Sequence, residues 1–121
     1  MNEVDALSVF LGGVISKPKR DRYLNLSSRE KGKENFLLDL SHVLKRHLVR
    51  SCKVVGLSEH EWNDNGYLFT SEHEFGKQVD KLKMAYDAAP WSGGWLLINS
   101  SGSSGVLRSD GRIDDEIFLR L

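Results

Sequence analysis

The sequence predicts an α+β fold, in which an antiparallel sheet packs against two main amphipathic helices and residues 1–121 form a single domain. The middle of the chain contains two long stretches whose apolar residues recur at three- and four-residue steps, the spacing of one helix face. The last third instead contains short apolar segments at 95–98, 106–107 and 117–119. Their connections are short and rich in Gly, Ser and Asp, which favours a three-strand antiparallel meander. We expect one or two further strands earlier in the chain, and the helices on one face of the sheet.

The segment 4–11 is apolar and fits either a short helix closed by Gly12-Gly13 or a strand. Acidic residues precede it and basic residues follow it, which reverses the charge order of a secretion signal. It is also far shorter than the roughly 20 residues that span a bilayer, so we interpret it as packing structure. Pro18 suits the first turn of a second helix, which Ser16 would cap and which would end near Leu26.

The clearest helical signal begins at Ser27, which has capping-box spacing to Glu30. From there to about Val49, one arc of the helical wheel carries Phe36, Leu37, Leu40, Val43, Leu44 and Leu48. A long amphipathic helix is therefore predicted over 27–49. The short segment 52–57 follows as a strand, because it is β-branched and bounded by polar residues.

The second main helix is predicted to begin at Ser71, which again has capping-box spacing to Glu74. Before it, 63–66 reads Asn-Asp-Asn-Gly, a turn sequence, and 67–69 is expected to be a brief strand. After it comes an apolar stripe at helical spacing, made of Phe75, Val79, Leu82, Tyr86 and Ala89. Pro90 then closes the predicted helix, as a proline just past a helix end does.

A family likeness is carried by Arg22-Tyr23-Leu24, Phe36-Leu37, Leu40 and His42, and by the tail from Gly94-Trp95-Leu96-Leu97-Ile98 through Arg120. In these stretches the chain resembles a family of small bacterial proteins of unknown function, over roughly two thirds of its length in pattern. The matching residues are mostly packing and capping residues. The resemblance implies a bacterial or phage-related source and assigns no activity.

Composition excludes some chemistries and disfavours others. The 17 basic residues balance the 17 acidic ones, whereas a dedicated nucleic-acid binder usually has a basic excess. Cys52 is the single cysteine, so neither an internal disulfide nor a cysteine-based zinc site can form. A reducing, cytoplasmic setting is the natural interpretation, with Cys52 as a small buried apolar residue. No cofactor is expected.

Two Glu-His-Glu triplets are the candidate metal ligands. His60 and His73, with Glu61 and Glu74, offer the nitrogen and oxygen donors that zinc or manganese accepts. The alternative is that each triplet simply begins a helix, because each lies in a Ser-x-x-Glu capping box. We favour this alternative, since the His-Glu-x-x-His spacing of metallohydrolases is missing.

The basic segment near the N-terminus is the candidate polyanion-binding site. Lys17, Lys19, Arg20 and Arg22 lie close together and could contact nucleic acid or an acidic protein surface. Acidic neighbours dilute the segment, so a solvated helix face is the alternative. Among possible partners, nucleic acid is therefore favoured less than another protein, and no membrane partner is expected.

The glycine- and serine-rich connection 99–105 could cradle an anion with its backbone amides. It lacks the Gly-Lys-Ser/Thr ending and the following helix of a phosphate-binding loop, and also the Gly-x-Ser-x-Gly pattern of a serine nucleophile. We therefore predict a simple hairpin connection.

The candidate partner-binding residues are aromatic and acidic side chains near loops, namely Trp62, Trp91, Asp114, Asp115 and Glu116. With no catalytic motif recognised, the sequence favours a non-catalytic protein-interaction module of the bacterial immunity, antitoxin-like or phage-encoded inhibitory kind. The alternatives are a metal-dependent hydrolase or nuclease built on the two histidines, and a nucleic-acid-binding protein built on the basic segment.

Overall fold

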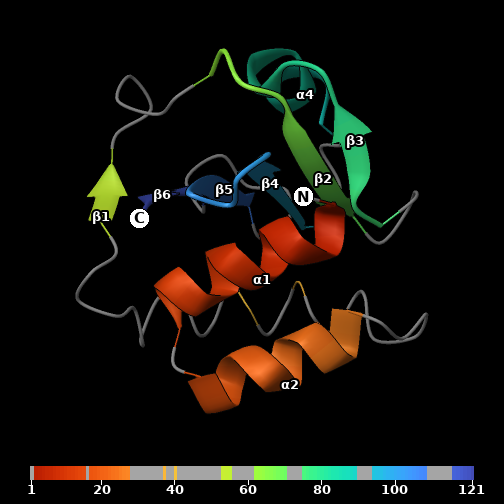
Figure 1. Ribbon diagram of the computed structural model, residues 1–121. Coiled ribbons are helices and arrows are strands. Elements are labelled where there is room, and N and C mark those ends of the chain that lie inside the picture. Colours follow the sequence, from red (N-terminus) through yellow and green to blue (C-terminus); the bar gives the residue numbers. More distant parts are fainter. Residues whose placement is uncertain are drawn as a thin grey trace.

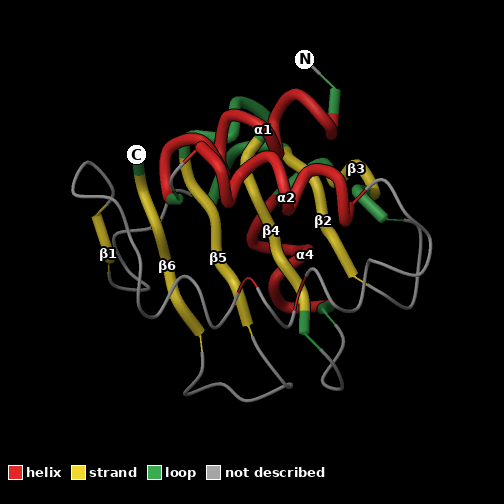
Figure 2. The backbone as a smooth tube through the Cα atoms, turned by 90° about the horizontal axis from the view of Figure 1, so that it is seen from below, coloured by secondary structure: helices red, strands yellow, loops and turns green. Residues whose placement is uncertain are grey.

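The computed structural model describes residues 2–15, 17–27, 37, 40, 53–55, 62–70, 75–89, 94–108 and 116–121. The strands are β1 Lys53–Val55, β2 Gly66–Thr70, β3 Lys77–Val79, β4 Trp95–Asn99, β5 Ser104–Arg108 and β6 Glu116–Arg120. They form one six-stranded sheet in the order β1-β6-β5-β4-β2-β3, with antiparallel pairing throughout (Figures 1 and 2). The predicted α+β class with an antiparallel sheet is confirmed.

The predicted C-terminal meander is confirmed as β4, β5 and β6. In β4 and β5, side chains alternate between the two faces of the sheet, because successive residues of a strand point in opposite directions. Leu96 and Ile98 belong to one apolar cluster, while Trp95 and Leu97 belong to the other. All five residues of β4 are buried, so both faces of the sheet are covered at its centre.

The N-terminal segment is a helix, α1 Glu3–Val14, which decides between the two alternatives left open by its sequence. Asn2 caps it through a reciprocal capping box with Asp5, whose N–H donates to Asn2 Oδ1 at 2.9 Å. Gly12 and Gly13 lie inside this helix and do not close it. Its buried face consists of Ala6, Leu7, Phe10, Leu11 and Val14.

The second helix, α2 Lys17–Ser27, has the position expected from Pro18 and Leu26. It returns beside α1 in the opposite direction (Figure 1). In the predicted long helix 27–49, the structure describes only Leu37 and Leu40 beyond its first residue. Both are helical and buried, and both pack in the same apolar cluster as α1.

The predicted helix from Ser71 to Pro90 is wrong over residues 75–81, while 71–74 lie outside the described residues. Phe75 and Gly76 form a turn, β3 follows, and only then does the helix α4 Leu82–Ala88 begin. Gly76 has a positive φ of 83°, and its N–H donates to the Leu68 carbonyl at 3.1 Å. Backbone pairing with β2 therefore outweighs the helical spacing of the side chains in this segment.

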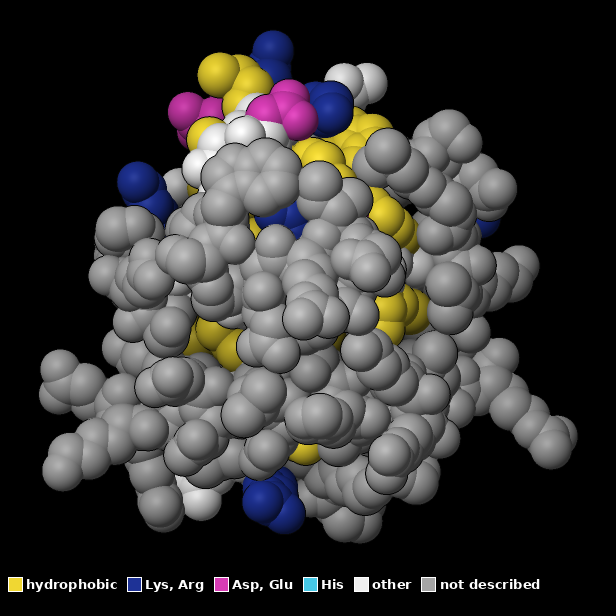
Figure 3. Space-filling view, turned by 180° about the vertical axis from the view of Figure 1, so that it is seen from behind, with side chains coloured by type: hydrophobic (Ala, Val, Ile, Leu, Met, Phe, Trp, Pro, Cys, Tyr) yellow, Lys and Arg dark blue, Asp and Glu magenta, His cyan; other side chains and the backbone are white. Residues whose placement is uncertain are grey.

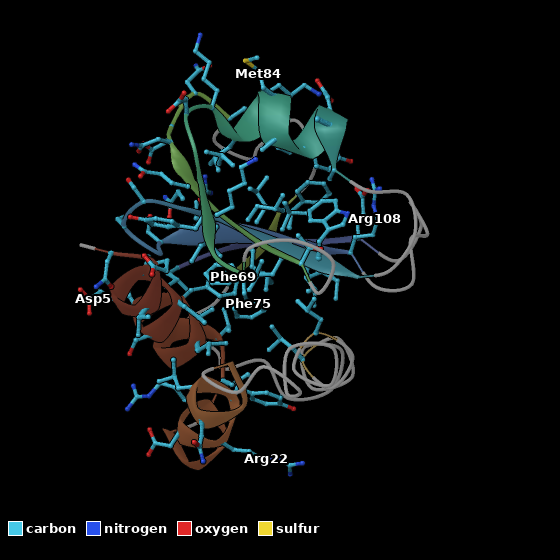
Figure 4. The ribbon with its side chains drawn as sticks, turned by 90° about the vertical axis from the view of Figure 1, so that its right-hand side faces the viewer. Asp5, Arg22, Phe69, Phe75, Met84 and Arg108 are labelled. Carbon is cyan, nitrogen blue, oxygen red and sulfur yellow. The ribbon has the colours of Figure 1, made fainter. Side chains whose placement is uncertain are left out.

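The helices lie on both faces of the sheet, so the expectation that they share one face is also wrong. The cluster under α1 includes Phe69, Leu96 and Leu107, whereas the opposite cluster combines Leu82 of α4 with Trp95 and other residues. Figure 4 shows α4 on one side of the sheet and α1 and α2 on the other. The fold thus has three layers.

The remaining strand predictions are confirmed, since β1 lies within 52–57 and β2 contains 67–69. Trp62 is not in a helix. No helix in the described part of the chain is long and apolar enough to cross a membrane.

Candidate functional site

The layer formed by α4 covers an aromatic cluster, which consists of Trp62, Tyr86, Trp95 and Phe118. Two backbone hydrogen bonds fasten the segment around Trp62 to the start of α4. The Lys83 N–H donates to the Trp62 carbonyl at 3.3 Å, and the Leu82 N–H donates to the Asp64 carbonyl at 2.9 Å. As a result the Trp62 ring lies beside that of Tyr86, with 4.8 Å between their centroids.

A buried polar network, made of Tyr86, Arg108 and Glu116, lies against this cluster. Arg108 and Glu116 face each other across β5 and β6, and each side chain is only 5% exposed. Arg108 donates from Nε to Glu116 Oε1 at 2.7 Å and from Nη2 to the same oxygen. The Tyr86 hydroxyl donates to Glu116 Oε2 at 2.6 Å. Both carboxylate oxygens are therefore occupied by internal donors, as a buried charge requires.

Aromatic rings complete the surroundings of the Arg108 guanidinium. Its carbon lies 4.9 Å from the Trp95 ring centroid and 5.7 Å from that of Tyr86. Such distances allow a cation–π attraction, which partly replaces lost hydration. Burial, and secondly the hydrogen bond to Glu116, raise the pKa of Tyr86 above its usual 10.0, so its hydroxyl stays protonated as the donor.

The outer surface of the same layer combines apolar and charged side chains. Met84 projects from α4 and is 68% exposed (Figure 4). Next to it, Lys83 Nζ lies 5.4 Å from the Trp62 centroid and 5.3 Å from the Tyr86 centroid, and it pairs with Asp87 at 3.0 Å. Seen from behind, the top of the molecule, where α4 lies, gathers apolar, basic and acidic side chains (Figure 3). We call Trp62, Lys83, Met84, Tyr86 and Asp87 the docking face.

The predicted partner-binding residues have different outcomes. Trp62 lies in the aromatic cluster and is partly exposed. Glu116, expected at a partner-binding surface, instead has its carboxylate buried against Arg108 and Tyr86, because that carboxylate neutralises the buried guanidinium. Trp91, Asp114 and Asp115 lie outside the described residues.

The candidate metal ligands His60, Glu61, His73 and Glu74 also lie outside the part of the chain that the structure describes. Within the described part, no three side chains of His, Cys, Asp or Glu come together in a way that could hold a metal ion. The metal hypothesis therefore receives no support from the described residues.

Of the candidate residues in the basic segment, the structure describes the side chains of Arg20 and Arg22, which have different surroundings. Arg20 is partly buried, with Nη1 only 2.8 Å from where a Cβ on Gly12 would lie, and its Nε is 3.8 Å from Asp21. Arg22 is exposed and points away from the sheet (Figure 4). Of Lys17 and Lys19, only the backbone is described, within α2.

The glycine- and serine-rich connection is a hairpin between β4 and β5, as predicted. Asn99 organises it, since its Oδ1 accepts from the Ser104 N–H at 3.2 Å and its Nδ2 donates to Ser103 Oγ at 2.8 Å. The Gly102 N–H donates to the Asn99 carbonyl at 3.1 Å. These amides bond within the chain, which leaves them unsuited to holding a phosphate.

Sequence reasoning missed Arg108 and Lys83. A signal for Arg108 existed, because opposite charges at Arg108 and Glu116 flank the connection between two predicted strands and would meet in an antiparallel hairpin. Lys83 had a weaker signal, its i,i+4 spacing to Asp87 on a predicted helix.

Comparisons with protein-family models, with curated proteins and with solved structures gave no match for this chain. The resemblance to small bacterial proteins accordingly stays a prediction.

Proposed function

We propose that this chain is a non-catalytic protein-interaction module that acts in the cytoplasm, of the bacterial immunity, antitoxin-like or phage-encoded inhibitory kind, and that it binds its partner through the docking face. The observation that carries the proposal is that α4 exposes Met84 on its outer surface, while the rings of Trp62 and Tyr86 remain partly exposed along its flank. Exposed methionine side chains are typical of adaptable protein-binding surfaces.

The composition of the docking face supports a protein partner. Trp and Tyr are enriched among the residues that dominate binding energy at protein interfaces, and Trp62 and Tyr86 supply both types. A charged pair, Lys83 and Asp87, adjoins the rings and would form part of a polar rim.

The polar network supports a binding role over a catalytic one. A general acid or base needs an available proton site within reach of a substrate. Glu116 instead accepts hydrogen bonds on both oxygens from Arg108 and Tyr86, and its side chain is almost fully buried. The network holds α4 against the sheet, so the docking face is ordered before binding and less conformational entropy is lost on association.

The test is co-expression of the full chain with the product of each adjacent gene, followed by size-exclusion chromatography and affinity measurement. Met84→Asp places a charge on the outer surface of α4 within the docking face and should weaken the complex about tenfold or more, as loss of an important interface residue does. Val4→Asp is the matched control, because Val4 is 58% exposed on α1, on the other side of the sheet.

The Val4→Asp variant should bind the partner as tightly as the original chain. The proposal fails if no neighbouring product forms a complex, or if the two variants weaken a complex equally. Circular dichroism of both variants establishes that each substitution leaves the fold intact.

A further inference from the structure

Lys83 lies in a cation site that the chain itself provides. Its Nζ is almost equidistant from two ring centroids, at 5.4 Å from Trp62 and 5.3 Å from Tyr86. The two rings are 4.8 Å apart and tilted by 56°, so they form two walls around the ammonium group. Asp87 Oδ1, 3.0 Å from Nζ, supplies the negative charge. Two aromatic rings and a carboxylate are the groups that recognise an organic cation in proteins.

Lys83 is held in this site only weakly. Its side chain is 52% exposed and that of Asp87 is 59% exposed, so water and salt screen their attraction. Because the Lys83 side chain is half exposed, water competes with the rings for its ammonium group, which limits the cation–π attraction. Lys83 is not one of the buried residues of the cluster beneath it, so the packing of that cluster does not depend on the position of its side chain.

We propose that Trp62, Tyr86 and Asp87 form a receptor for an arginine side chain of the partner, and that Lys83 occupies this receptor as an internal ligand until the arginine displaces it. This inference rests on the proposed function, because it names the group that the docking face recognises. Arginine fits better than lysine, since its planar guanidinium stacks on rings, pairs with a carboxylate through two donors and is less hydrated.

The buried side of the same cluster supports the choice of arginine. There the guanidinium of Arg108 lies over the rings of Trp95 and Tyr86 and pairs with the carboxylate of Glu116. The outer side repeats this combination of two rings and one carboxylate, with a lysine in place of the arginine.

The test uses the full chain and a small probe, N-acetyl-arginine methylamide, with its uncharged citrulline analogue as the control ligand. Binding is followed by NMR through the indole N–H signal of Trp62, which a Trp62→Phe variant assigns. Lys83→Met removes the internal cation and keeps the aliphatic chain. It should tighten probe binding about fivefold, because the probe then no longer has to displace Lys83 from an exposed cation–π contact and an exposed ion pair.

The matched control is Lys81→Met, which removes the same charge from the exposed N-cap residue just before α4. It should change probe affinity less than twofold, because Lys81 does not lie over the rings. In the Lys83→Met background, Asp87→Asn should weaken probe binding again. The citrulline analogue should not shift the Trp62 signal in any variant.

The receptor is disproved if Lys83→Met and Lys81→Met tighten the probe equally, or if the citrulline analogue binds as well as the arginine probe. Failure of the receptor is distinct from failure of the proposed function. If Met84→Asp breaks the complex but Lys83→Met does not change probe binding, only the receptor is disproved. If Lys83→Met tightens probe binding but the chain binds no protein encoded by an adjacent gene, the receptor is supported and the proposed partner is overturned.

Discussion

The Tyr86 hydroxyl donates a 2.6 Å hydrogen bond to Glu116 Oε2, and so joins α4 to β6 across 30 residues of chain. Arg108 on β5 occupies the other oxygen of the same carboxylate. One buried carboxylate thereby connects the helix above the sheet to two strands within it. Because the docking face lies on that helix, its geometry depends on this contact.

Replacing Tyr86 by Phe should lower the free energy of unfolding at pH 7 by about 1.5 to 3 kcal/mol, the usual value of a hydrogen bond to a charged group. The ring remains, so packing against Trp62 and Trp95 is kept. Urea unfolding followed by circular dichroism measures the change. A loss below about 0.5 kcal/mol, the range of an ordinary surface substitution, would show that the bond contributes little.

The same variant reveals a pH dependence. Because the pKa of Tyr86 is raised above 10.0 in the folded chain, the unfolded chain loses this proton first as pH increases. Stability from Tyr86 is therefore complete below pH 10.0 and decreases as pH rises toward the folded-state pKa. The stability difference between the original chain and Tyr86→Phe should shrink as the pH rises above 10.0. A constant difference over that range would contradict the raised pKa.

The pair Arg108 and Glu116 should show strong energetic coupling. Removing one partner leaves a buried charge uncompensated, so Arg108→Met and Glu116→Gln should each cost about 3 kcal/mol or more. The double variant should lose clearly less than the sum, because no buried charge then remains. A double-mutant cycle by urea unfolding measures the coupling, and strictly additive losses would show that the two charges are independent.

Replacing each of two glycines by alanine should change the stability of the chain in opposite directions. At Gly105 the new Cβ would lie 2.6 Å from the Phe10 ring, which is fully buried and cannot move aside, so about 1 to 3 kcal/mol should be lost. At Gly12, inside α1, the nearest atom belongs to the flexible end of Arg20. There alanine should stabilise the chain by up to about 1 kcal/mol through helix propensity. Thermal unfolding of both variants tests the pair, and equal effects would contradict the packing.

Asn99→Ala should destabilise the chain by about 1 to 3 kcal/mol, because it leaves the buried Ser104 N–H without the Asn99 acceptor. Amide hydrogen exchange at Ser104 should accelerate with it. Ser101→Ala is the control, since Ser101 is exposed and only its hydroxyl contact with Ser103 is removed. If Ser101→Ala costs as much as Asn99→Ala, the side chain of Asn99 does not organise the turn.

The candidate site was only partly accessible from the sequence. Trp62 was recognisable as a loop-proximal aromatic residue, and Glu116 as an acidic one. Their roles differ because burial depends on tertiary contacts: β5 places Arg108 opposite Glu116, and the resulting ion pair draws the carboxylate inward. No property of the local sequence near Glu116 indicates that the Tyr86 hydroxyl donates a hydrogen bond to its carboxylate.

The sequence by itself determined the features that depend on neighbouring residues. Short apolar runs with short polar connections specify the meander of β4 to β6, and Pro18 marks the start of α2, because these preferences act within a few residues. Only the tertiary structure decided that 77–79 pairs with β2, that α4 covers the opposite face from α1, and that β1 joins β6. The reason is that strand pairing and burial depend on partners distant in the chain, whose backbone hydrogen bonds and apolar contacts outweigh local helical spacing.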